Sequence, residues 1–105
     1  MPKAKSYQKH LVNQLRDPQE AAKYLNAALH DPDPHVFLLA LRDLAEAQGG
    51  MTQLAERTSL NRENLYRTLS LRGNPRFFNL LAVLDAFDVE ISLHPRERKK
   101  RKKCA

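Results

Sequence analysis

The chain has 105 residues, of which 42% are apolar and 29% are charged, and this size and balance fit one globular domain with a single core. Its longest apolar run, VFLLAL at residues 36–41, is far shorter than the roughly 20 residues of a membrane-spanning helix, so we expect no membrane association. The single cysteine, Cys104, excludes an internal disulfide and a paired-cysteine metal site. The basic N-terminus is not followed by the apolar stretch of a secretory signal, so we expect a cytoplasmic protein.

The formal net charge of +6 is unevenly distributed along the chain. Residues 17–48 hold six acidic and two basic side chains, residues 51–78 hold five arginines and two glutamates, and the tail RERKKRKKCA at 96–105 holds seven Lys and Arg against one Glu. We therefore predict a domain over 17–94 with an acidic and a basic half. The tail, 95–105, is expected to be disordered and to strengthen contact with any polyanion without selecting a sequence.

The first half of the chain predicts two helices after an ambiguous start. Residues 1–16 place Tyr7, Leu11 and Leu15 at helical spacing, but the segment is short and polar, so we expect it to order only on a partner. DPQE at 17–20 and DPDP at 31–34 are typical helix starts, which predict one helix to about residue 29 and a second from about 34 to 48. Gly49 and Gly50 end the second helix.

The stretch TQLAERTSLNRENLYRTLS, residues 52–70, predicts a helix-turn-helix. Thr52 and Asn61 are suitable N-caps for its two helices, and Ser59 occupies the turn position where many such motifs have glycine. Glu63 and Arg67 are spaced for an ion pair within the second helix. The five apolar residues have the spacing that packs two crossing helices against each other: Leu54, Ala55, Leu60, Leu65 and Leu69.

With the leucines of the second helix facing the core, the opposite face is expected to read DNA. The predicted base contacts are Asn61, Arg62, Glu63, Tyr66 and Arg67, with Arg62 as the chief reader because arginine with guanine is the commonest specific pair. The predicted phosphate contacts are Thr52, Gln53, Ser70, Arg72 and Arg76. The plainer alternative is a helical hairpin whose arginines form a solvated face.

The last part of the chain predicts a helix and a strand. Asn74 and Pro75 are placed to start a helix that runs to about residue 87 and turns Phe77, Leu80, Leu81, Leu84 and Phe87 inward. VEISLH at 89–94 then alternates, with Val89, Ile91 and Leu93 on one side, as in a half-buried strand. One strand cannot form a sheet alone, so we predict a homodimer in which two copies pair this strand antiparallel.

No pattern of residues indicates catalysis. The four histidines are scattered, and neither a nucleophile with its base, nor paired carboxylates, nor a glycine-rich phosphate loop occurs. We therefore predict a protein that is not an enzyme and that uses no metal or cofactor.

Residues 17–93 resemble the addiction-module antidote proteins, an antitoxin family with a lambda-repressor-like (Xre-type) helix-turn-helix. The resemblance rests on YLNAAL before the second helix, on MTQLAERTSLNRENLYRTLS, on GNP before the last helix and on the terminal apolar strand. It implies an all-α, lambda-repressor-like helical bundle that acts as a dimeric, nucleoid-associated repressor of its own operon on double-stranded operator DNA.

The same resemblance implies that the protein neutralises a small basic toxin of the RelE/ParE superfamily. The acidic half would attract such a partner, while residues 1–16 could instead fold onto it, and the sequence does not choose between them. A stand-alone phage- or plasmid-type repressor with no toxin partner is the alternative function, and a module that binds only protein is a third.

Overall fold

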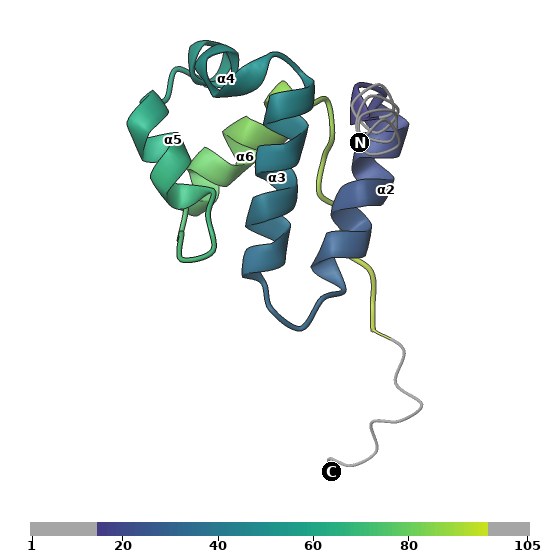
Figure 1. Cartoon of the computed structure of the whole chain (residues 1–105). Coiled ribbons are helices and arrows are strands. Elements are labelled where there is room, and N and C mark those ends of the chain that lie inside the picture. The colour runs from purple at the N-terminus through teal and green to yellow at the C-terminus, as the bar shows by residue number, and fades with distance from the viewer. Residues whose placement is uncertain (1–14, 97–105) are drawn as a thin grey trace, which may run out of the picture.

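A computed structural model describes residues 15–96 of the chain. Within this range the chain forms five helices and no strand (Figure 1): α2 (Pro18–Leu29), α3 (His35–Ala47), α4 (Gly50–Thr58), α5 (Arg62–Thr68) and α6 (Phe77–Ala86). The prediction of an all-α domain is confirmed at this level. None of the helices in the described range has the length and hydropathy that spanning a bilayer requires.

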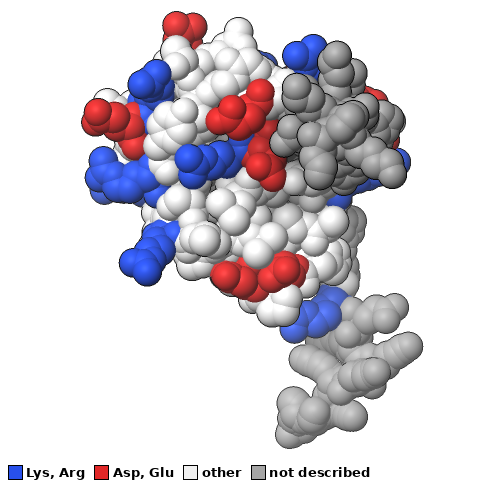
Figure 2. All heavy atoms as spheres, in the orientation of Figure 1, with Lys and Arg blue, Asp and Glu red and all other residues white. Residues whose placement is uncertain are grey.

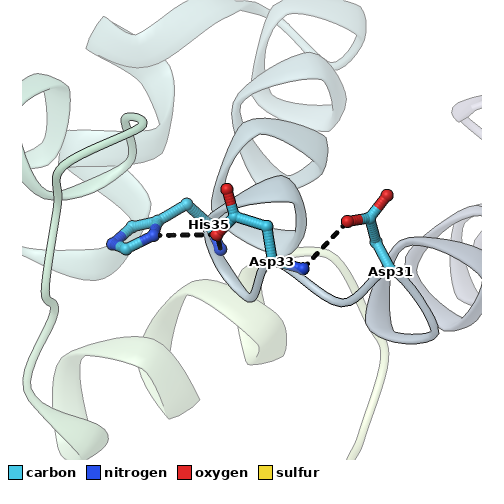
Figure 3. A network of polar contacts seen from close by, with 3 residues as sticks. All are labelled: Asp31, Asp33 and His35. Carbon is cyan, nitrogen blue, oxygen red and sulfur yellow. Dashed lines mark hydrogen bonds and ion pairs between the residues drawn. The ribbon is translucent and has the colours of Figure 1, made fainter.

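Helices α2 and α3 form a hairpin, and local side-chain bonds set where each begins. Asp17 is the N-cap of α2, where its carboxylate accepts a hydrogen bond from the Gln19 amide at 3.1 Å, and a proline follows it. In the turn before α3, Asp31 accepts from the Asp33 amide at 2.9 Å, and Asp33 accepts from the His35 amide at 2.9 Å (Figure 3). The predicted starts of both helices are confirmed.

The core lies where α3 packs against α2 on one side and α4 on the other, with α6 against α4. No polar or charged side chain is buried in residues 15–96. Leu15, which precedes α2, also belongs to the core. The largest fully buried side chains come from α3, α4, α6 and the residues that follow α5 and α6: Leu41, Leu44, Met51, Leu69, Val83 and Phe87.

The start predicted for α4 is wrong. Thr52 is not the N-cap, because α4 already begins at Gly50, and its N-cap is Gly49. Both glycines have positive φ, 112° and 91°, a conformation that only glycine adopts without strain. The glycine pair therefore turns the chain directly from α3 into α4 without a side-chain cap, and Thr52 lies in the first turn of the helix.

The start predicted for α6 is also wrong, because the preceding loop packs on the end of α5. Gly73 is buried, and a Cβ atom there would lie 1.8 Å from the Thr68 carbonyl oxygen, so only glycine permits this approach. Asn74 does not cap the helix, which begins at Phe77 with Arg76 as its N-cap. Phe77, predicted to face inward, is 61% exposed, while Leu84 and Phe87 are buried as predicted.

The segment after α6 is extended and runs beside α2 (Figure 1). The Val89 amide donates to the Leu84 carbonyl at 3.1 Å, and Val89 is half-buried, whereas Ile91 and Leu93 are exposed. No strand is present here, and residues 15–96 offer this segment no second strand to pair with. The pairing of Val89, Ile91 and Leu93 with a second copy stays a prediction.

Candidate nucleic-acid interface

Helices α4 and α5 are joined by a tight turn whose backbone is fixed by hydrogen bonds. Ser59, at the end of α4, is in the left-handed region with φ 61° and ψ 28°. The amides of Ser59 and Leu60 both donate to the Ala55 carbonyl, the latter at 3.2 Å. Serine thus adopts the conformation that glycine takes most readily, and the turn closes although it contains no glycine.

Helix α5 is capped at its start and buried along its back. The Asn61 side chain accepts a hydrogen bond from the Asn64 amide at 3.0 Å, which confirms the predicted cap. Leu65 and the following Leu69 are almost fully buried against the rest of the domain. Because these residues lie on one side of α5, the opposite side of the helix faces solvent.

The residues predicted to contact bases lie on this solvent-facing side. Five are exposed, namely Asn61, Arg62, Glu63, Tyr66 and Arg67, and Asn64, which the sequence analysis did not select, is exposed as well. The predicted ion pair between Glu63 and Arg67 does not form: no oxygen–nitrogen distance within 4.0 Å joins them in the described structure. Exposed pairs of this kind gain little free energy, and both charged groups remain directed at solvent.

The residues predicted to contact phosphates flank α5 on two sides. Thr52 and Gln53 are exposed in the first turn of α4, and Arg72 and Arg76 are exposed in the loop after α5. Ser70 is half-buried, and its hydroxyl donates to the Arg67 carbonyl at 2.8 Å.

One hydrogen bond joins the two predicted sets. The guanidinium of Arg62 donates from Nη1 to the Thr52 hydroxyl oxygen at 2.8 Å. The start of α5 is thereby held next to the first turn of α4. The predicted chief base reader and a predicted phosphate contact are therefore neighbours, although they lie ten positions apart in the sequence.

Two arginines have roles that the sequence analysis missed. The Arg42 guanidinium, on α3, lies 5.2 Å from the centre of the Tyr66 ring, which is a cation–π contact. Arg57 donates to the carbonyl of Ala86 at the end of α6, so this arginine holds two helices together. Neither contact follows a spacing pattern, because each joins elements that only the tertiary fold brings together.

The surface charge follows the two halves of the sequence. In Figure 2, Lys and Arg side chains lie along the left edge, over α5 and the loop that follows it, with acidic groups among them. A group of Asp and Glu lies at the bottom of the same view, at the turn between α2 and α3. The α4–α5 side is therefore the better surface for a polyanion.

Comparison with known protein families matches residues 5–95 to the family described as "Probable addiction module antidote protein". The chain belongs to this family. It is also similar to a protein described as "Uncharacterized protein" from Haemophilus influenzae, with 32% identity over 83 residues that cover 79% of this chain and 84% of that protein. No solved structure matches. The predicted membership of the antidote family is confirmed, and an antidote of an addiction module has a toxin as its counterpart.

This addiction-module antidote also carries an acidic surface on α2, α3 and the adjoining turns. Its members are Asp17, Glu20, Asp31, Asp33, Asp43 and Glu46, all exposed except the half-buried Glu20. Lys23 lies 3.5 Å from Glu20, and the Tyr24 hydroxyl donates to Asp43 at 2.6 Å, which links α2 to α3.

The N-terminal segment was the other candidate for binding the partner, by folding onto it. Of its three apolar residues at helical spacing, Tyr7 and Leu11 lie outside the described residues and Leu15 is buried in the core.

Proposed function

We propose that this antidote is a transcriptional repressor of its own operon and that it binds double-stranded operator DNA through α4 and α5, which act as a helix-turn-helix. It works as a homodimer on DNA, in the nucleoid of the cytoplasm, and neutralises a small basic toxin of the RelE/ParE superfamily. It performs no catalysis in this role.

The outer face of α5 is the observation that carries the proposal. A helix enters the major groove when one side is anchored to the domain and the other presents long polar side chains near its N-terminus. Leu65 and Leu69 supply the anchor, and the exposed Arg62, Glu63 and Arg67 supply the polar side chains. A hairpin that serves only packing does not need these three groups on its solvent side.

The backbone contacts follow from the residues that flank α5. The hydroxyl and amide side chains of Thr52 and Gln53 donate to one phosphate strand, and the Arg72 and Arg76 guanidinium groups bind the other side of the groove. Such contacts position the helix without reading sequence. Arg62 lies between these sets and reads guanine, while Tyr66 contacts a thymine methyl group.

A second copy is recruited through the extended segment after α6. No backbone hydrogen bond within the described chain involves residues 90–94, so their amide and carbonyl groups are available to a neighbouring strand. Antiparallel pairing of two such segments across a two-fold axis satisfies them and covers Ile91 and Leu93. The resulting symmetry matches an operator with two half-sites.

The toxin binds the acidic surface on α2 and α3. Exposed carboxylates that lie away from the DNA-binding side attract a basic protein and leave α5 accessible. One antidote can in this way hold DNA and toxin at the same time.

A gel shift with DNA from upstream of the gene, at about 50 mM salt, tests the DNA-binding role. We expect wild-type binding and a loss of about 5- to 150-fold for Arg67→Ala on this DNA, with a much smaller loss on random DNA. Lys23→Ala is the matched control, since it removes one exposed positive charge from α2. Equal losses in the two variants would reduce α5 to a general basic surface, and no binding at any salt would leave only a protein-binding module.

Co-expression with the neighbouring gene distinguishes an antidote that binds its toxin from a stand-alone repressor. We expect a small basic neighbour to co-purify with the antidote, and Asp31→Asn together with Asp33→Asn to weaken the complex at low salt. A neighbour that never co-purifies would favour the stand-alone repressor.

A further inference from the structure

Helix α2 and the extended segment after α6 border an open groove of about 400 Å³. Leu25 and Leu29 of α2 line it together with Phe37 of α3, and Val89 and Glu90 line it from the extended segment. Figure 1 shows this segment passing beside α2. A space of this size lies at the lower end of the range for ligand pockets, so it admits one or two side chains of a partner. We call it the α2 groove.

The lining of the α2 groove is largely apolar, and part of it is open to solvent. Leu25 is buried and Phe37 and Val89 are half-buried, whereas Leu29, the last residue of α2, is 59% exposed. A side chain that enters the groove removes this apolar surface from water, which is favourable. The α2 groove therefore fits an apolar or aromatic side chain of another molecule, the kind of buried anchor that dominates the affinity of protein interfaces.

The charge around the α2 groove is negative. The exposed Glu90 lines it, and no Lys or Arg is among the described residues that do so. Asp31 directly follows His30, which also lines the groove, and Asp33 belongs to the same turn, where Figure 2 shows a group of acidic side chains. A partner that fills the groove therefore meets carboxylates beside it, and these favour a basic protein.

Two other occupants fit the α2 groove less well. A second copy in an isologous contact would bring the same carboxylates to the same place, where like charges repel. The tail of this chain, RERKKRKKCA at 96–105, offers positive charge but no large apolar side chain. A basic protein that carries an apolar side chain among its Lys and Arg residues supplies both.

We propose that the α2 groove anchors the toxin. One apolar or aromatic side chain of the toxin enters the groove against Leu29, and Lys or Arg residues beside it pair with Asp31, Asp33 and Glu90. This inference rests on the proposed function, in which the toxin binds the acidic surface on α2 and α3, and it adds the apolar contact that holds the complex together. The carboxylates speed association, whereas the buried anchor slows dissociation.

The test measures how tightly the full chain binds the basic protein encoded by the neighbouring gene. Isothermal titration calorimetry is carried out at about 50 mM and about 500 mM salt, because salt screens charges but not apolar contacts. Leu29→Ser makes the wall of the groove polar. Leu71→Ser is the matched control, since Leu71 is also 59% exposed but lies in the loop after α5. A double variant, Asp31→Asn with Asp33→Asn, tests the carboxylates.

We expect Leu29→Ser to weaken binding by about tenfold or more at both salt concentrations, as the loss of a buried anchor does. Leu71→Ser should stay within about twofold of wild type, the effect of a residue outside the interface. The double aspartate variant should bind more weakly than wild type at low salt and approach it at high salt. Because Leu29 is exposed, the thermal unfolding midpoint of Leu29→Ser should match that of wild type.

Three results would overturn the anchor and leave the toxin-binding function intact. Wild-type affinity in Leu29→Ser would show that the toxin does not use the groove. Equal losses in Leu29→Ser and Leu71→Ser would show that the position of the leucine does not matter. A lower unfolding midpoint in Leu29→Ser would mean that residues of this chain fill the groove. Wild-type protein that does not bind its neighbour at either salt concentration would overturn the toxin-binding function and the anchor together.

Discussion

The hydrogen bond between Arg62 and Thr52 allows a quantitative test of how α5 reads DNA. Both side chains are exposed and the bond is 2.8 Å long, so removing it should change the stability of the fold very little. Arg62→Ala removes a base contact, which costs about 1–3 kcal/mol on operator DNA, or about 5- to 150-fold in affinity. On random DNA its effect should be much smaller.

Thr52→Val keeps the shape of the side chain and removes the hydroxyl. If this hydroxyl orients the Arg62 guanidinium toward a base, Thr52→Val should cost about 1 kcal/mol on operator DNA, the usual contribution of one hydrogen bond. The same substitution in an Arg62→Ala background should cost less, because the group that it orients is absent. A double-mutant cycle read by fluorescence anisotropy on operator and random duplexes gives this coupling.

Additive effects of the two substitutions on operator DNA would show that the Thr52 hydroxyl acts only as a phosphate contact and does not orient the Arg62 guanidinium. The base-reading role of Arg62 is contradicted if Arg62→Ala weakens binding to operator and random DNA equally. That result would make Arg62 a phosphate contact and leave base reading to other residues of α5.

Three further predictions concern the fold that positions α5. Ser59→Gly should stabilise the protein by about 0.5–1 kcal/mol, because glycine relieves the left-handed strain in the turn, and a thermal midpoint below that of wild type would contradict this. Gly73→Ala should destabilise it by about 1–3 kcal/mol in urea unfolding, because the added methyl group meets the Thr68 carbonyl, and an unchanged midpoint would mean that the loop does not pack there. The hydrogen bonds from the His35 amide and ring hold the pKa of Asp33 below its ordinary value of 3.8. The stabilisation that these bonds give the fold is therefore complete above pH 3.8, and it is lost as the pH falls through the lower pKa of the folded state. NMR titration of the His35 amide should follow this loss in wild type, and an identical titration in Asp33→Asn would refute the assignment.

The helix starts that depend on local side-chain bonds were predictable from the sequence. Asp17, Asp33 and Asn61 each accept a backbone amide near the start of a helix, and this chemistry involves residues no more than three positions apart. A cap of this kind leaves its signature in a short run of sequence, which is why α2, α3 and α5 begin near the expected positions.

The starts of α4 and α6 depend on backbone conformation and tertiary packing, which the sequence pattern did not reveal. Thr52 has the chemistry of a cap, but two glycines with positive φ start α4 before it. Asn74 and Pro75 have the expected order, but Gly73 holds the loop against α5 and delays α6 until Phe77. Phe77 and Phe78 lie exposed at this start.

In the candidate site, too, some features follow from the sequence pattern and others depend on how the helices pack. The exposed face of α5 follows from helical periodicity once Leu65 and Leu69 are placed in the core. The bond between Arg62 and Thr52 and the stacking of Arg42 on Tyr66 require the relative placement of α3, α4 and α5. The strand pairing that we propose after α6 would involve a second chain, so the fold of one copy does not contain it.

The proposed function depends most on contact between the outer face of α5 and the bases of operator DNA. Amide chemical-shift changes in the full chain, recorded as DNA from upstream of the gene is added, test it most directly. The account predicts the largest changes at residues 61–67, smaller ones at Thr52 and Gln53, and little change on α2. Changes concentrated on α2 and α3, with the amides of α5 unmoved, would contradict it.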